Sequence, residues 1–296
     1  MRGAFMILNT PFTESKAVDW EDLARELEFV DKCGAHGAVW PQGSSGVATL
    51  TKSERMQGMK VLAQAARGRT IALVLGVQGK NIPEMLEYAH EAEQLAPDAV
   101  IAMPPTEAVS QEDYREYFRA LGRATRRPVI VQTSGGARDL APSTDLIVDL
   151  AEEMPNFGYV KEESQPLVAR MKAEIARKPP MKSVFGANLG AFWLYQMRLG
   201  ADGVITGNAM YADVMARIWE LHEHGQADQA RDAYAKWLLM RNVNEQIPGA
   251  DLYMLKKRGV FKTTTTRGSR QQSFSAEDIA EIEHRFSALR PYLATE

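Results

Sequence analysis

Short apolar runs alternate along the chain with segments in which apolar residues recur at helical spacing. The apolar runs predict buried strands, because a parallel strand covered on both faces is a continuous apolar stretch. They lie at about residues 4–8, 37–41, 70–76, 98–103, 128–133, 157–161, 181–185 and 202–206. The amphipathic segments predict helices at about residues 19–33, 52–67, 81–95, 111–125, 142–153, 166–177, 188–199 and 209–223.

Residue types that favour helix starts support several of these segments. Proline suits a first helical turn, where a missing N–H costs nothing, and we expect this role for Pro83 and Pro142. Side chains that accept from free N–H groups suit the N-cap, and we expect this role for Asp19, Thr51, Ser110 and Asn188.

Eight strand–helix units within residues 1–224 predict a (β/α)8 barrel, the TIM-barrel fold. An open doubly wound sheet is the alternative, but the early Gly-x-Gly-x-x-Gly turn typical of it is missing. Residues 225–296 contain no further strand pattern. We expect them to form a helical appendage packed on the barrel, with helices at about 227–244, 251–260 and 276–293 and a polar loop at 262–274.

Composition narrows the class of protein. The 296 residues are 45% hydrophobic and 25% charged, which is typical of a globular protein. A net charge of −3 and a pI near 6.0 give no reason to expect a nucleic acid or an acidic membrane as partner. The lone Cys33 excludes an internal disulfide. No signal-peptide core or run of ~20 apolar residues is present, so we expect a cytoplasmic protein.

Lys161, at the end of the sixth predicted strand, is the first candidate for chemistry. Active sites of such barrels lie at the carboxyl ends of the strands. Burial there disfavours the ammonium form and lowers the lysine pKa, which makes the amine a nucleophile toward carbonyl carbons. The alternative is a lysine that leaves the strand end and reaches solvent.

Other strand ends carry small or polar residues that converge on the same place. The turn Gly43-Ser44-Ser45-Gly46 offers hydroxyls and backbone N–H groups that suit a carboxylate, although such clusters are also ordinary turns. The five histidines show no metal-site spacing, and no Gly-x-Ser-x-Gly or phosphate-loop motif is present. We therefore expect neither a metal nor another cofactor.

With these residues noted, the chain resembles the family of dihydrodipicolinate synthase and N-acetylneuraminate lyase, which are class I aldolases. The resemblance rests on ordered segments that match the family's motifs: Thr10-Pro11-Phe12, Gly43-Ser44-Ser45-Gly46, Val160-Lys161-Glu162 and Gly200-Ala201-Asp202-Gly203-Val204. It implies an eight-stranded barrel, often tetrameric, in which Lys161 forms an imine with a 2-oxo acid.

Three departures from the family pattern bear on the substrate. Gln132 stands where the family usually has a proton-relaying tyrosine, Val47 replaces a loop glutamate, and Thr106 falls near the place of a second tyrosine. Glutamine cannot titrate, so dihydrodipicolinate synthase activity is not expected. Glu163 follows Lys161 by two residues, and strand alternation favours one face for both, unless the strand ends at Lys161 and Glu163 is a solvated loop residue.

A Lys-x-Glu pattern with glutamine at the tyrosine position is similar to the L-2-keto-3-deoxyarabonate dehydratase branch. We therefore expect a lyase acting on a 2-keto-3-deoxy sugar acid, with Lys161 and Glu163 as catalytic residues. A pyruvate-releasing retro-aldolase and a non-catalytic 2-oxo-acid-binding barrel remain alternatives. A homodimer or homotetramer is the expected assembly. The expected substrate-binding residues are Ser44, Ser45, Gln132, Thr133, Gly186 and Thr206.

Overall fold

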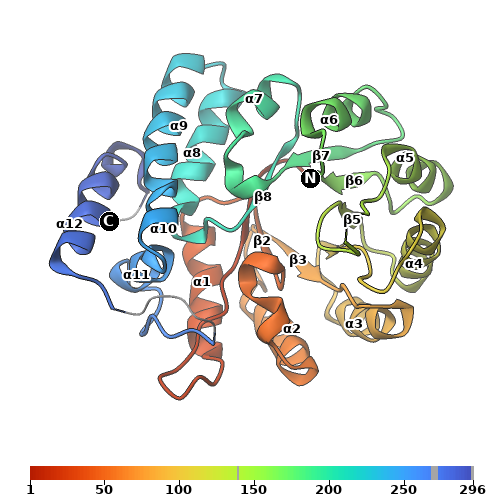
Figure 1. Cartoon of the computed structure of the whole chain (residues 1–296), viewed down its shortest axis with the longest axis horizontal. Helices are drawn as coiled ribbons and strands as arrows, with labels where there is room; N and C mark the ends of the chain where they lie inside the picture. Colours follow the sequence, from red (N-terminus) through yellow and green to blue (C-terminus); the bar gives the residue numbers. More distant parts are fainter. Residues whose placement is uncertain (139, 268–272, 295–296) are drawn as a thin grey trace.

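Eight parallel strands close into a barrel in the order in which they occur along the chain (Figure 1). The computed structural model describes residues 1–138, 140–267 and 273–294. The strands are β1 Gly3–Ile7, β2 Gly37–Trp40, β3 Ala72–Gly76, β4 Ala99–Ala102, β5 Val129–Gln132, β6 Tyr159–Lys161, β7 Ser183–Gly186 and β8 Gly203–Thr206. Pairing of β8 with β1 closes the sheet, which confirms the predicted (β/α)8 barrel.

A ring of helices surrounds the barrel. It consists of α1 Trp20–Lys32, α2 Lys52–Ala65, α3 Ile82–Leu95, α4 Gln111–Ala124, α5 Thr144–Glu153, α6 Leu167–Ile175, α7 Trp193–Arg198 and α8 Ala212–Glu223. Short 3₁₀ turns precede or replace the starts of some helices: η1 Gly43–Ser45, η2 Val47–Thr49, η3 Asn188–Gly190 and η4 Ala209–Tyr211.

The predicted helix starts are right in four places and wrong in two. Asp19, Thr51 and Ser110 are N-caps whose side chains accept a backbone N–H, and Pro83 lies in the first turn of α3. Asn188 is not a cap: it and the following Leu189 have φ near +50°, a left-handed backbone that cannot continue as an α-helix. Helix α7 therefore begins at Trp193, and α5 begins after its cap Ser143, beyond Pro142.

Side-chain alternation divides the core into two layers. Every second residue of the strands points into the barrel, where Ile7, Val39, Val74, Ile101, Ile130, Phe185 and Ile205 fill the interior. The intervening residues pack outward against the helices. Gln132 and Lys161 continue the inward positions of β5 and β6 by two residues beyond Ile130 and Tyr159. The barrel interior is thus filled by apolar side chains along most of the strands and is polar where the strands reach their carboxyl ends.

After α8 the chain forms α9 Ala227–Arg241, α10 Val243–Gln246, α11 Ala250–Lys257, α12 Ala276–Ser287 and the 3₁₀ turn η5 Arg290–Tyr292. Helix α9 lies along α8 and buries Ala230, Tyr234 and Trp237. The predicted polar loop at 262–274 has no helix or strand in its described part, and residues 268–272 lie outside the described residues. The division of the chain at residue 225 into a barrel and a helical appendage packed on it stays a prediction.

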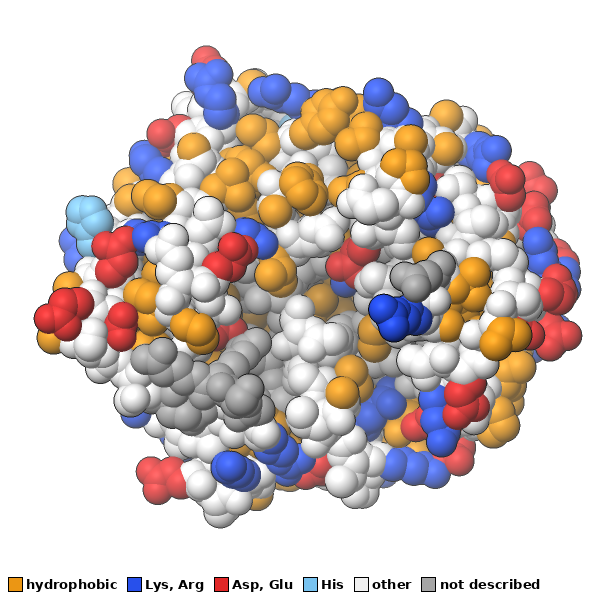
Figure 2. Space-filling view, viewed as in Figure 1, with side chains coloured by type: hydrophobic (Ala, Val, Ile, Leu, Met, Phe, Trp, Pro, Cys, Tyr) orange, Lys and Arg blue, Asp and Glu red, His pale blue; other side chains and the backbone are white. Residues whose placement is uncertain are grey.

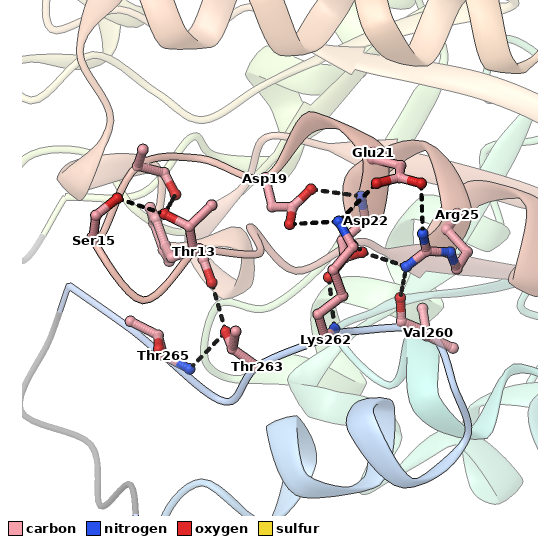
Figure 3. A network of polar contacts seen from close by, with 12 residues as sticks. Thr13, Ser15, Asp19, Glu21, Asp22, Arg25, Val260, Lys262, Thr263 and Thr265 are labelled. Atoms are coloured by element: carbon pink, nitrogen blue, oxygen red, sulfur yellow. Dashed lines mark hydrogen bonds and ion pairs between the residues drawn. The ribbon is translucent and has the colours of Figure 1, made fainter.

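Polar contacts fasten the segment after α11 to the start of α1 (Figure 3). Lys262 Nζ pairs with Asp19 at 2.9 Å and with Glu21 at 2.7 Å, and Arg25 donates to the Val260 carbonyl at 3.1 Å. Both carboxylates lie at the N-terminus of α1, where the helix dipole favours negative charge. The C-terminal segment therefore crosses beside the loop that follows β1.

Candidate active site

Lys161 ends β6, and its side chain is buried at the carboxyl end of the barrel. Its Nζ donates to Gln132 Oε1 at 3.1 Å and lies 3.2 Å from Glu163 Oε2. Burial lowers the pKa of Lys161, and the Glu163 carboxylate partly opposes this by raising it. The lowered pKa increases the share of neutral amine, the form that attacks a carbonyl carbon.

Glu163 reaches the lysine although β6 ends two residues earlier. Its carboxylate also accepts a hydrogen bond from the Ser134 hydroxyl, and Ser134 Oγ in turn accepts from Gln132 Nε2 at 3.1 Å. Lys161, Gln132, Ser134 and Glu163 thus form a closed polar ring. Since an amide and a hydroxyl do not titrate near neutral pH, Glu163 is the titratable side chain that contacts Lys161 among the described residues.

Thr133 lies on the outer side of β5, opposite to Gln132. Its hydroxyl donates to Glu162 Oε1 at 2.6 Å and accepts from the N–H groups of Glu163 and Ser164 at 2.9 and 3.2 Å. One donor and two lone pairs are all that a hydroxyl has. In this arrangement Thr133 therefore has no hydrogen-bonding capacity left for the substrate hydroxyl that we expected it to orient.

The two serines of the β2 loop differ in their surroundings. Ser44 is exposed at the barrel mouth, whereas the Ser45 hydroxyl is buried and donates to the Leu8 carbonyl at 2.6 Å. The expectation of free backbone N–H groups in this turn is wrong at two positions, because the N–H of Ser45 and of Gly46 bond to carbonyls within the η1 turn. The Ser44 hydroxyl remains available as a donor for a substrate carboxylate, together with the backbone N–H groups of Gly43 and Ser44 that the turn does not use.

Gly186 and Thr206 end β7 and β8 on the outward side of the barrel. A Cβ on Gly186 would lie 2.0 Å from Gln196 Oε1 of α7, so this glycine allows α7 to approach. Thr206 is buried and accepts from Asn208 Nδ2 at 2.8 Å. Strand alternation directs both of these positions away from the interior, because Phe185 and Ile205 before them point inward.

A cavity of about 130 Å³, lined by polar residues together with Leu189, Met210 and Tyr211, lies at the carboxyl ends of β1 and β8. The face seen in Figure 2 is hollowed near its centre, where these strands end in Figure 1. Arg241, at the end of α9, has a buried Nε without a hydrogen-bond partner in the described part of the chain. The polar residues lining the cavity are Asn9, Ser44, Asn208, Arg241, Asn244 and Asp251.

Sequence reasoning missed Ser134, Gly207 and Arg241. Ser134 follows Gln132 at the same spacing of two that identified Glu163, so the signal was present. Gly207 continues the inward face of β8, and a Cβ there would lie 2.7 Å from Ser44 Oγ. Arg241 comes from a helix outside the barrel, and no local pattern connects it with the strand ends.

Glu26 of α1 is a fully buried carboxyl group behind the site. Its Oε1 accepts from the backbone N–H and the side-chain amide of Asn9, at 3.1 and 3.0 Å. Burial raises the pKa of Glu26 to about 8, despite these hydrogen bonds. Glu26 therefore holds Asn9, which lines the cavity, as a protonated acid at neutral pH.

The raised pKa of Glu26 predicts a stability that falls with rising pH. The unfolded chain loses this proton near pH 4.5 and the folded chain only near pH 8, so between these values the unfolded state is increasingly favoured. One group contributes at most ~1.4 kcal/mol per pH unit. Glu26→Gln is expected to flatten this slope in urea melts between pH 5 and 8, and an unchanged slope would contradict it.

A buried strand-end lysine beside a carboxylate, in a barrel of eight parallel strands, defines the class of Schiff-base lyases. The chain belongs to the dihydrodipicolinate synthetase family, whose model matches residues 1–267.

Two relatives that are similar in sequence are both named 4-hydroxy-tetrahydrodipicolinate synthase. The 4-hydroxy-tetrahydrodipicolinate synthase of Chlorobium chlorochromatii is 26% identical over 269 residues, covering 88% of this chain and 89% of the relative. That of Chloroherpeton thalassium is 28% identical over 208 residues, covering 70% and 68%. At this identity they support the family and leave the substrate open.

Solved structures share the fold. Dihydrodipicolinate synthase from Rhodopseudomonas palustris superposes with a TM-score of 0.86 at 21% identity, covering 98% of each chain. The enzyme from Aquifex aeolicus gives 0.86 at 22% identity, covering 99% of each. No helix in the described part of the chain has both the length and the apolar character needed to cross a membrane.

Proposed function

We propose that this protein is a lysine-dependent dehydratase of a 2-keto-3-deoxy sugar acid, as in the L-2-keto-3-deoxyarabonate dehydratase branch. One observation carries the proposal: Glu163 Oε2 lies 3.2 Å from Lys161 Nζ, while Gln132 occupies the place of the family's tyrosine. A titratable group beside the imine nitrogen is what proton removal from the neighbouring carbon requires.

The reaction begins when the neutral Lys161 amine adds to the C2 carbonyl of the substrate and water leaves, giving an iminium. The iminium acidifies the C3 protons, and Glu163 removes one of them to give an enamine. The enamine expels the C4 hydroxyl, which takes the proton back from Glu163 and leaves as water. Loss of a proton from C5 and gain of one at C3 then convert the conjugated iminium of a five-carbon substrate into an enol at C4–C5, which becomes the C5 aldehyde as C4 takes up the enol proton. Hydrolysis of the iminium frees Lys161. The net change is the loss of one water from the substrate.

The polar cavity at β1 and β8 supports a hydroxylated substrate. Asn208 and Asn244 offer both donors and acceptors there, and the guanidinium of Arg241, which also lines the cavity, offers further donors. A polyhydroxylated chain satisfies such a lining, whereas an apolar chain would leave its polar groups without partners. We assign the carboxylate to Ser44 and the hydroxyl-bearing tail to the cavity.

A retro-aldolase that releases pyruvate is the second candidate, because the same iminium can accept the electron pair of the C3–C4 bond when the C4 hydroxyl loses its proton. Product analysis separates the two. A panel of 2-keto-3-deoxy acids incubated with the enzyme should give one dehydrated semialdehyde without pyruvate. Pyruvate plus an aldehyde would establish the retro-aldolase instead. A substrate panel that yields neither product, and no borohydride-trapped adduct, would favour the third candidate, a non-catalytic 2-oxo-acid-binding barrel.

Two substitutions test the assignment of the substrate's two ends. Ser44→Ala is expected to raise KM for every 2-oxo acid, because the carboxylate does not change during the reaction and uniform binding acts on KM. A hydrogen bond to a charged group contributes ~1.5–3 kcal/mol, so the rise is on the order of tenfold or more.

Arg241→Ala is the matched comparison. It is expected to raise KM for hydroxylated 2-keto-3-deoxy acids while leaving the borohydride trapping of pyruvate, which has no tail, unchanged. Equal effects on both ligands would place Arg241 outside the tail-binding cavity.

Assembly into a homodimer or homotetramer stays a prediction. The family is typically oligomeric. Exposed apolar side chains lie on α6, at Val168, and at the start of α7, at Phe192 and Tyr195. Sedimentation velocity measures the assembly, and a monomer at micromolar concentration would contradict the prediction. Cytoplasmic localisation also stays a prediction.

A further inference from the structure

A cluster of buried charged residues lies directly behind the lysine, on the outer side of β6. Glu162 stands between Lys161 and Glu163 in sequence, yet its fully buried side chain points the other way. Its Oε1 accepts from the Thr133 hydroxyl and from the Ser164 N–H, both at 2.6 Å. Its Oε2 accepts from Arg170 Nε at 2.9 Å. Glu162 therefore ties together β5, the β6 loop and α6.

The same contacts fix the backbone of Glu163. Thr133 Oγ1, oriented by Glu162, accepts the N–H of Glu163 at 2.9 Å and that of Ser164 at 3.2 Å. The Ser164 hydroxyl donates a hydrogen bond to the Thr133 carbonyl at 3.1 Å. Because β6 ends at Lys161, these hydrogen bonds fix the position of Glu163, and strand pairing does not.

Helix α6 supplies two side chains to this cluster, four residues apart and so on one face of the helix. Arg170 pairs with Glu162 and also donates to the Pro142 carbonyl at 2.7 Å. Glu174 is fully buried, and neither of its carboxyl oxygens accepts a hydrogen bond from a described residue. One arginine faces two carboxyl groups, and two buried carboxylates side by side would repel each other.

A proton on Glu174 resolves this conflict. Burial, followed by the adjacent Glu162 carboxylate, raises the pKa of Glu174 to about 10, and Arg170 opposes this. As a carboxylic acid, Glu174 gains a hydroxyl that donates to Glu162. The cluster then contains one negative and one positive charge.

We propose that Glu162, Arg170 and Glu174 form a clamp behind β6 that positions Glu163 beside Lys161, with Glu174 acting as a hydrogen-bond donor to Glu162. These are positioning residues, because they lie on the far side of the strand from the substrate. The inference rests on the proposed role of Glu163 as the proton carrier and goes beyond it by naming what holds that carboxylate in place.

The test separates imine formation by Lys161 from proton removal by Glu163, with pyruvate as the probe. Borohydride trapping followed by mass spectrometry reports the imine, and deuterium uptake into the pyruvate methyl group in D2O reports proton removal at C3. Glu162→Gln is expected to keep trapping but to slow exchange by roughly 10- to 10²-fold, since a small misplacement of a catalytic group has effects of this size. A structural role unrelated to Glu163 would lower both readouts together.

Two substitutions at Glu174 test its role as a donor. Glu174→Gln keeps an N–H that donates to Glu162, so exchange is expected within about twofold of wild type. Glu174→Leu has a similar volume but no donor, so exchange is expected to fall as in Glu162→Gln. Exposed Glu152 of α5 provides the control, and Glu152→Gln should leave both readouts unchanged. Circular dichroism confirms folding, and if Glu174→Leu does not fold, the contrast between Glu174→Gln and Glu162→Gln decides.

The outcomes are distinguishable. Wild-type exchange in a folded Glu162→Gln variant that still traps pyruvate would overturn the clamp and leave the proposed function intact. Loss of exchange in Glu174→Gln as large as in Glu162→Gln would overturn the donor role. Failure of the wild-type protein to trap pyruvate would overturn the proposed function and, with it, this inference.

Discussion

Lys161→Ala is expected to abolish both borohydride trapping and turnover while the protein stays folded. The covalent route through the imine is lost with the amine, and a loss of several orders of magnitude in kcat/KM follows from removing a nucleophile. The fold should survive, because the apolar side chains that fill the barrel interior are unchanged and Glu163 keeps its hydrogen bond from the Ser134 hydroxyl.

The measurements are intact-protein mass after borohydride with pyruvate, and initial rates with the sugar acid that the substrate panel identifies. Lys172→Ala is the matched control, because Lys172 is an exposed lysine on α6. Near-normal rates in purified Lys161→Ala would remove the Schiff-base mechanism from consideration.

Glu163→Gln is expected to keep imine formation and to lose turnover by ~10²–10⁴-fold, the usual range for a general acid–base group. The amide preserves the shape of the side chain and removes only its ability to take up and release a proton. Its oxygen can still accept from the Ser134 hydroxyl, so the loop should keep its conformation.

Single-turnover trapping measured beside the steady-state rate separates the two effects. Normal turnover would show that another group carries the proton. Loss of trapping together with turnover would instead give Glu163 the role of positioning Lys161, from which it lies 3.2 Å away.

Much of the site follows from periodicity in the sequence. Alternation of period two correctly paired Glu163 with Lys161, and the same rule applied to Gln132 would have added Ser134. It would also have directed Gly186 and Thr206 to the helix side of the barrel, because Phe185 and Ile205 occupy the inward positions before them. Both residues end strands, but a position at a strand end does not by itself determine which face of the barrel the side chain occupies.

Hydrogen bonds within the structure decide which hydroxyl groups of the β2 loop are available to bind a substrate. Ser44 and Ser45 are the same residue type in consecutive positions, so composition could not distinguish them. The structure buries the Ser45 hydroxyl against the Leu8 carbonyl and leaves Ser44 at the mouth. The Leu8 carbonyl is 37 residues away in sequence, and only the pairing of β1 with β2 brings it near.

The sequence by itself determined the barrel, its eight units and the lysine at the end of the sixth strand, because hydrophobic periodicity and strand order are local properties. Only the tertiary structure decided that Arg241 of α9 lines the cavity beside Ser44, and that Arg170 and Glu174 of α6 lie behind Glu163. Those side chains come from helices, and the face that a helix turns toward a strand end depends on packing across the whole barrel. The position of Lys161 therefore follows from the strand pattern in the sequence, whereas the side chains that surround its site depend on how the helices pack against the barrel.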